Sequence, residues 1–330
     1  MSVSGEAAKL REVADGVWQV CLPLPMRPSI VNVWLVRGGD GFTLIDTGMH
    51  TGDSLAALRA AFDAVGAAPH DVVRLVCTHH HVDHYGASGP IRTLTGARVH
   101  LHPLEAERAM AAPGARGEDR GFLARHGVPA VPPEKELPPP SRWVGTVYCP
   151  VAPDALLADG DVLDLGGGRA LEAIWTPGHT PGHCCLLLRP DGVLFVGDHL
   201  LPKITPHVGV MPDGPENPLG DFLASQDKIA RVDATVICPA HGGVYDDHRR
   251  RARQIVDFHR VRKLAMLEII TRRPCTAYEV ALDAFAIEPA NRFQVVAATS
   301  ETLAHLELLR REGRALRHDD GVVRWSARRP

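Results

Sequence analysis

The run HHHVDH at residues 79–84 constrains this chain more than any other feature of its sequence. It follows the apolar segment 72–77, which is typical of a buried strand. His79, His81 and Asp83 are spaced two residues apart, so an extended backbone points their side chains the same way. Imidazole and carboxylate are common ligands of zinc-like ions. The run therefore predicts two partly built metal sites side by side, rather than a tag or a set of surface histidines.

Similar residues follow four other apolar segments. His179, Asp198 and His241 each come just after a stretch that is typical of a strand, and Asp46 does so upstream of the histidine run. In layered α/β folds, loops converge on a site at the ends of the strands. We therefore expect these side chains to lie close to residues 79–84.

In their order, these segments resemble the motifs of the metallo-β-lactamase-fold hydrolase superfamily, over roughly residues 15–245. The matching motifs are LIDTG at 44–48, THHHVDHYG at 78–86, TPGH at 176–179, GD at 197–198 and PAHG at 239–242. The resemblance implies an α/β fold, the αββα sandwich of this family. It also implies a metal-dependent hydrolase, similar to glyoxalase II-like members.

The resemblance assigns seven ligands and one supporting acid. It implies that one ion is held by His79, His81 and His179, a second by Asp83, His84 and His241, and that Asp198 bridges the two. Asp46 is implied to orient ligands without binding metal. We expect two divalent ions, zinc first, with Mn²⁺ and Fe²⁺ as alternatives. Antibiotic-hydrolysing members usually change one ligand, often to cysteine, so β-lactam hydrolysis is disfavoured.

The reaction class follows from the expected ions. Zinc lowers the pKa of a bound water from about 15.7 to about 7, which makes hydroxide available at neutral pH. A hydroxide that bridges two ions can attack a carbonyl or phosphoryl group, with Asp83 and Asp198 orienting it and relaying its proton. Esters, thioesters, lactones and phosphoesters all pass through an oxyanion that such a pair stabilises, so the metal site does not choose among them.

Composition adds limits. The chain has 330 residues, of which 45% are hydrophobic, which is enough for one large domain and one small domain. It contains no apolar run of about 18 residues, so we expect no membrane span, and its first residues lack the apolar core of a signal peptide. Seven irregularly spaced cysteines argue against a disulfide framework. We therefore expect a cytoplasmic protein.

We place the catalytic domain at residues 1–245 and a second domain at 246–330. Within the first, residues 103–153 are rich in proline. Long proline-rich loops are uncommon in compact domains unless they act as lids or binding elements. We interpret this stretch as an insertion that packs over the metal cleft and shapes substrate access; a surface connector without a functional role is the plainer alternative.

The last 85 residues are predicted to form three helices and a hairpin. One helix runs from about 247 to 271, a second begins at a capping box of Thr276 and Glu279, and a third covers 293–312. An Asp-Gly turn then predicts a hairpin within 316–325. This winged-helix pattern resembles the C-terminal domain of the lactamase-beta-like ribonuclease group. Its net charge is +5, against −8 for the remainder, but glutamates are interleaved with the basic residues, so we expect no DNA binding.

Three functions remain open. The leading hypothesis is hydrolysis of a small acyl substrate, a thioester, ester or lactone. The second is an endoribonuclease acting on single-stranded RNA, and the third is a non-catalytic scaffold of the same fold. Homodimerisation stays an option. Candidate substrate contacts are Tyr85, as a hydrogen-bond donor to an oxyanion, His199, which follows Asp198, and Lys203 and His207, near an anionic group.

Overall fold

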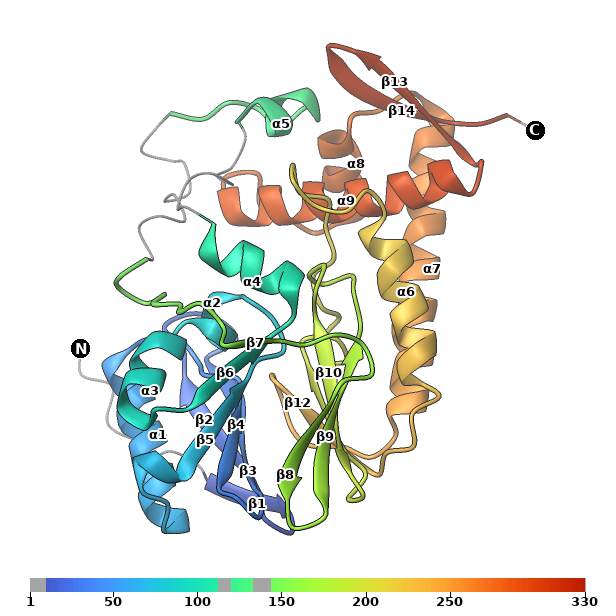
Figure 1. Ribbon diagram of the computed structural model, residues 1–330. Coiled ribbons are helices and arrows are strands. Elements are labelled where there is room, and N and C mark those ends of the chain that lie inside the picture. Colours follow the sequence, from blue (N-terminus) through green and yellow to red (C-terminus); the bar gives the residue numbers. More distant parts are fainter. Residues whose placement is uncertain (1–9, 112–119, 133–143, 330) are drawn as a thin grey trace.

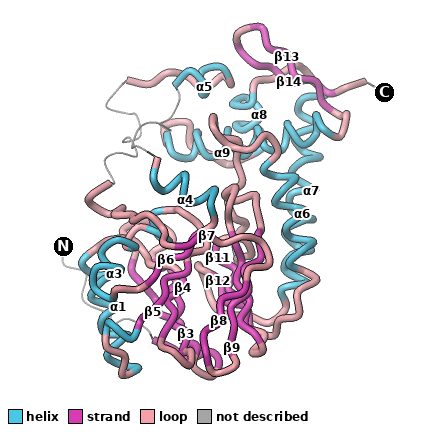
Figure 2. The backbone as a smooth tube through the Cα atoms, in the orientation of Figure 1, coloured by secondary structure: helices cyan, strands magenta, loops and turns pink. Residues whose placement is uncertain are grey.

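Two β-sheets face each other at the centre of the molecule, as Figures 1 and 2 show for the described residues 10–111, 120–132 and 144–329 of the computed structural model. The first sheet runs in chain order through β1 (Leu10–Ala14), β2 (Val17–Pro23), β3 (Ile30–Arg37), β4 (Phe42–Ile45), β5 (Val72–Val76), β6 (Arg98–Leu101) and β7 (Ala155–Leu156). The second has the order β12 (Val236–Pro239), β11 (Val193–Gly197), β10 (Cys184–Arg189), β9 (Arg169–Trp175) and β8 (Val162–Gly166).

Strand directions in both sheets bring particular chain ends together. In the first sheet, β4 to β7 pair in parallel, whereas β1 to β4 pair antiparallel. In the second sheet, β11 and β12 are the parallel pair. The loops after β4, β5, β11 and β12 carry the predicted site residues, so the parallel pairing places these loops at shared sheet edges.

The second sheet is buried on both faces. Along β10, Leu186 and Leu188 pack between the two sheets, while Cys185 and Leu187 pack against the outer helices. This alternation follows the period of two along a strand. A strand covered on both faces reads as a continuous apolar run, as residues 184–188 do.

Helices cover the outer faces and one end of the sandwich (Figure 1). The first sheet is flanked by α1 (Gly52–Val65) and α3 (Ser88–Thr95), with η1 (Pro69–Asp71) between them in the chain, and the second sheet by α6 (Pro218–Ile229) and α7 (His248–Arg272). The other helices are α2 (Val82–Tyr85), α4 (Pro103–Met110), α5 (Arg120–Arg125), α8 (Ala277–Ala284) and α9 (Arg292–Arg311). The expected αββα sandwich is therefore confirmed.

The C-terminal residues have their own core. Met266 of α7, Leu306 of α9 and the wholly buried Trp325 pack together beneath the hairpin of β13 (Ala315–Asp320) and β14 (Val322–Ala327). The capping box of Thr276 and Glu279 forms as expected at the start of α8. The order of helices and hairpin agrees with the sequence, whereas a winged-helix domain with its boundary at 245/246 stays a prediction.

The proline-rich insertion is described in part. Its prolines at 133 and 138–140 lie outside the described residues. The described part includes α4, which lies at the same end of the sandwich as α9 (Figure 1). Across the described ranges, no helix has the length and apolarity needed to span a membrane.

Candidate metal centre

Four strand ends converge on the predicted ligands. His79 and His81 follow β5, and Asp83 and His84 lie on the short helix α2 directly after them. His179, Asp198 and His241 follow β9, β11 and β12, respectively. Both sheets thus contribute ligands, so the site depends on the two sheets packing face to face.

The first cluster consists of His79, His81, His179 and Asp198. Nδ1 of His81 lies 3.0 Å from Nε2 of His79 and 3.0 Å from Nε2 of His179. Nε2 of His179 lies 3.5 Å from Oδ2 of Asp198. All donor atoms of this cluster fall within 4.8 Å of one another, as the ligands of one ion require.

The second cluster consists of Asp83, His84 and His241. Oδ2 of Asp83 lies 3.3 Å from Nε2 of His241 and 3.8 Å from Nε2 of His84. A carboxylate and two imidazoles form a donor set that suits zinc and related divalent ions.

Asp198 faces both clusters. Its Oδ2 lies 3.5 Å from His179 and 3.6 Å from His84, and its Oδ1 lies 3.5 Å from His241. The backbone N–H of Asp198 donates to Nε2 of His183 at 3.3 Å. His183, which is out of phase with the ligands in the sequence, thus helps to hold the carboxylate between the clusters.

Four of the imidazoles are fixed by a hydrogen bond at Nδ1. Nδ1 of His179 and Nδ1 of His241 donate to the backbone carbonyls of His207 and Ile30, at 2.8 and 2.9 Å. Nδ1 of His84 contacts Oδ2 of Asp46 at 2.8 Å, and Nδ1 of His79 contacts Oγ1 of Thr78 at 3.0 Å. These partners leave Nε2 of each ring facing the centre, as is common in metal sites.

Asp46 positions two of the predicted ligands through hydrogen bonds. It is buried, and its carboxylate also accepts hydrogen bonds from the backbone N–H of Thr78 at 2.7 Å and from the Thr78 hydroxyl. One side chain therefore holds His84 directly and His79 through Thr78. This geometry fits the orienting role implied by the resemblance.

The two clusters have buried donor atoms that a pair of bound cations would satisfy. Nε2 of His84 and Oδ1 of Asp198 are buried and have no hydrogen-bond partner, and each points at the neighbouring donors described above. A buried polar atom without a partner costs about 1–3 kcal/mol, and a bound ion removes that cost. The two clusters can therefore bind metal; the assignment of individual ligands stays a prediction.

Electrostatics separate the histidines into two kinds. Burial, together with neighbouring imidazoles, lowers the pKa of His79 well below its usual value. Burial also acts to lower the pKa of His84, but Asp83, Asp198 and Asp46 outweigh it and raise that pKa. The three carboxylates thus favour positive charge at this site, which also favours the binding of a cation.

Two side chains outside the sequence motifs stabilise the ligand loops. The buried carboxylate of Glu105, on α4, accepts from the backbone N–H of His80 at 2.9 Å and from that of Gly182 at 2.6 Å. The buried amide of Asn32 donates to the carbonyls of Pro239 and Gly242 on either side of His241. Sequence reasoning missed both residues, because only the fold reveals their partners.

Two family descriptions match the sequence. The Metallo-beta-lactamase superfamily matches residues 26–241, well over half of the chain, and the description "Metallo-beta-lactamase-like, C-terminal domain" matches residues 264–328. This chain belongs to the metallo-β-lactamase superfamily. It is accordingly an enzyme of the hydrolase class, as expected from the motifs.

Relatives within the superfamily agree with this assignment. A solved metallo-beta-lactamase family protein from Thermus thermophilus is 34% identical, with a TM-score of 0.80 over 96% of this chain and 100% of its own. A probable metallo-hydrolase of Bacillus subtilis (strain 168) is 27% identical over 90% of this chain and 93% of its own length. An acyl-coenzyme A thioesterase of Gallus gallus is 35% identical over 51% of this chain and 56% of its own length.

In this superfamily member, a cleft of about 700 Å³ opens onto the first of the two clusters that can bind metal. His81 and His179 lie in its wall, beside residues from α4, from the stretch 209–218 and from the first turn of α9. Among the described residues that line it, the charged side chains other than histidine are Arg108 and Asp213. A guanidinium N–H of Arg108 donates to the carbonyl of Asp213 at 2.8 Å.

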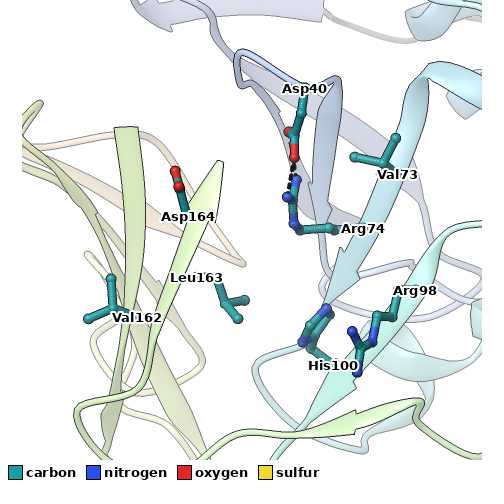
Figure 3. A pocket seen from close by; sticks show the side chains of 8 residues that line it. All are labelled: Asp40, Val73, Arg74, Arg98, His100, Val162, Leu163 and Asp164. Atoms are coloured by element: carbon teal, nitrogen blue, oxygen red, sulfur yellow. Dashed lines mark hydrogen bonds and ion pairs between the residues drawn. The ribbon is translucent and has the colours of Figure 1, made fainter. Parts of the chain in front are cut away.

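A second hollow, of about 370 Å³, lies away from the ligands between β5 and β6 of one sheet and β8 of the other (Figure 3). Its lining residues are Asp40, Val73, Arg74, Arg98, His100, Val162, Leu163 and Asp164. Arg74 donates to the Asp40 carboxylate at 2.9 Å, the pair drawn with dashes in Figure 3. This described lining includes no predicted ligand.

The structure does not gather the four candidate substrate contacts at the cleft. Tyr85 is buried, and its hydroxyl donates to the carbonyl of Val151 at 2.7 Å, so it has no free donor for an oxyanion. His199 is buried against Phe222, and burial lowers its pKa to about 3. Both side chains therefore belong to the interior of the protein.

The other two candidates are not among the described residues that line the cleft, although the backbone carbonyl of His207 accepts from His179 of its wall. Lys203 is exposed outside the described lining. His207 contacts Ser300 and Glu301 of α9. We carry none of the four side chains into a substrate-binding role.

Proposed function

We propose that this chain hydrolyses acyl thioesters at a two-metal centre, with zinc as the first choice of ion. The observation that carries the proposal is the position of His81 and His179, which belong to a metal-capable cluster and also line the 700 Å³ cleft. A thioester carbonyl in this cleft would lie beside the ions. The similarity to an acyl-coenzyme A thioesterase supports the same substrate class.

Seven side chains would hold the ions: His79, His81, His179 and Asp198 in the first cluster, shared through Asp198 with Asp83, His84 and His241 in the second. When bound, such a pair lowers the pKa of a coordinated water toward neutrality and polarises the substrate carbonyl. In the hydrolysis of a thioester, the oxygen of water would form a bond to the carbonyl carbon. The C–S bond breaks with its electron pair on sulfur, and a proton from the water passes to sulfur to give an acid and a thiol.

Asp83 is the residue best placed to carry that proton. Burial favours its neutral form, but His84 and His241 outweigh this effect and lower its pKa. Its carboxylate is therefore ionised at neutral pH and can accept a proton at Oδ2. Asp198 is ionised for a similar reason, since His84, His241 and His179 lower its pKa against the opposing effect of burial. Its two oxygens are directed at the two clusters, so we assign it the bridging role.

The cleft lining favours an acyl substrate over single-stranded RNA. An RNA groove needs several cationic side chains that follow the phosphates, and aromatic side chains on which bases stack. The described lining offers one arginine, offset by Asp213, and its aromatic side chains other than histidine are Tyr148 and Phe293. This charge balance suits a substrate whose bound portion is uncharged.

The test is a parallel hydrolysis screen of the purified protein with and without a chelator. It compares acetyl-coenzyme A, an acyl-glutathione, a simple lactone, a phosphodiester and a short single-stranded RNA. We expect thioester turnover that the chelator abolishes and that added Zn²⁺ restores. Chelator-sensitive RNA cleavage without thioester turnover would overturn the proposal in favour of the nuclease.

A further inference from the structure

The cleft beside the metal centre carries an unusual concentration of exposed apolar side chains. Besides Val144 at 40%, three methionines and one phenylalanine in its wall are each more than a third exposed: Met26 at 39%, Met110 at 42%, Met211 at 47% and Phe293 at 68%. Leaving such surface in water is unfavourable by about 25 cal/mol per Å². Apolar side chains gathered at one place mark a binding surface more often than scattered ones do.

These four residues come from four separate segments. Met26 lies between β2 and β3, Met110 ends α4, Met211 precedes α6, and Phe293 lies in the first turn of α9. Segments this far apart in the sequence meet only because the fold brings them around one cleft. None of the four is a predicted ligand, so metal binding does not account for them.

The rest of the described wall is compatible with the same kind of ligand. Val82, Val144 and a set of prolines continue the apolar surface. The hydroxyl of Tyr148 donates to the carbonyl of His80 at 3.1 Å, and Arg108 is bonded to the carbonyl of Asp213. These two hydrogen-bonding groups of the wall are thus engaged with the protein, and the Thr180 hydroxyl, which has no partner, is buried beneath the surface of the cleft.

We propose that the cleft binds the unbranched, apolar chain of a fatty acyl thioester, with Met211 and Phe293 as specificity-determining residues. This inference rests on the proposed function. The carbonyl end lies at His81 and His179, and the chain extends from them along the cleft toward the four exposed side chains. A volume of about 700 Å³ is within the range of small-molecule sites, roughly 300–1,000 Å³. Methionine side chains are flexible and polarisable, so three of them can adapt to chains of different length.

The proposal predicts a strong dependence on chain length. Each methylene that leaves water for an apolar wall contributes about a fourfold gain in kcat/KM. We expect kcat/KM to rise from acetyl- to octanoyl-coenzyme A, mainly through a lower KM, and to stay high for palmitoyl-coenzyme A below its micelle concentration. The same comparison of acetyl and octanoyl groups on N-acetylcysteamine separates the chain from its carrier. A gain on both carriers supports the acyl site, whereas a gain on coenzyme A alone overturns it.

Substitutions in the cleft wall test which side chains cause the dependence of kcat/KM on chain length. Phe293→Ser and Met211→Ser are expected to reduce the octanoyl-to-acetyl ratio of kcat/KM roughly tenfold each, through KM rather than kcat. Phe293→Leu should restore most of the ratio, because it restores an apolar side chain. Val261→Ser is the matched control: Val261 is 62% exposed on α7 and lies outside the described cleft lining.

The outcomes separate the two proposals. No hydrolysis of any thioester would contradict the proposed function itself. Acetyl thioester hydrolysis with a flat or falling dependence on chain length would leave the function standing and overturn the fatty acyl site. An octanoyl-to-acetyl ratio that Phe293→Ser and Met211→Ser leave unchanged, in variants with unaltered thermal unfolding, would also overturn it.

Discussion

Oδ2 of Asp46 lies 2.8 Å from Nδ1 of His84, and Asp46 holds this position with a left-handed backbone, at φ 60°. Few residues other than glycine adopt that conformation, and Asp and Asn are the usual exceptions. The strand end therefore carries an acid that can both make the turn and reach the ligand. An alanine at this position would therefore strain the backbone as well as remove the hydrogen bond to His84.

Asp46→Asn is expected to keep the turn and weaken metal binding about tenfold to a hundredfold, since His84 loses its charged partner. Competition with a fluorescent chelator measures the affinity. Asp53→Asn, at an exposed position of α1, is the control that should bind metal like the parent chain. An affinity unchanged in Asp46→Asn would mean that this carboxylate does not orient the ligand.

Metal content tests the seven-ligand assignment. We expect the protein to bind close to two divalent ions per chain. His241→Ala should retain about one, because the first cluster keeps all of its donors. Elemental analysis after dialysis measures this directly, with His70→Ala, whose side chain is 82% exposed, as control. A parent chain that saturates with a single ion would rule out the dinuclear centre.

Gly178 precedes the ligand His179 at a position that tolerates no side chain. Its φ is +139°, and a Cβ there would lie 2.3 Å from the Cβ of Phe222. Gly178→Ala should therefore lower the free energy of unfolding by about 2–4 kcal/mol and displace His179. Urea unfolding and chelator competition measure the two effects. Gly243→Ala, in the loop after His241 with no neighbouring atom within 4 Å, should change stability by less than about 0.5 kcal/mol; equal effects of the two substitutions would contradict this explanation.

Ionisation of Glu301, on α9, makes the free energy of unfolding depend on pH. Burial alone would raise its pKa, but His207, His305 and Arg262 lower that pKa to about 2. Because the folded pKa lies below the unfolded value of about 4.3, the carboxylate contributes stability that is fully present above the unfolded pKa. This contribution is lost as the pH falls through the folded pKa.

Glu301→Gln should thus reduce the free energy of unfolding at pH 7 by on the order of 2–3 kcal/mol. The difference from the parent should narrow steadily as the pH falls from about 5 toward 2. Urea titrations at several pH values measure it, with Glu268→Gln as control, since the side chain of Glu268 is 68% exposed. A difference that stays constant across this range would show that ionisation of Glu301 is not involved.

The resemblance of the motifs predicted the sandwich, and local patterns predicted the convergence of the ligand residues. Apolar runs mark β5, β11 and β12, and the short loops after them leave the ligands few directions to take. The cleft wall could not be predicted in the same way. Met26 and Phe293 are far apart in the chain, and an exposed methionine or phenylalanine has no local signature. The candidate contact Tyr85 failed for a related reason, since a neighbour of a ligand in the sequence can point into the core.

Glu105 has a consequence for how the centre responds to the loss of its ions. Through the backbone N–H groups of His80 and Gly182, it ties the loop after β5 to the loop between β9 and β10. We therefore expect the two loops to hold their relative positions, so that the imidazoles that they carry keep their spacing before an ion binds. Ion uptake then requires little conformational ordering, so it should be fast and leave the far-ultraviolet spectrum unchanged, unlike the metal-driven folding of a zinc finger.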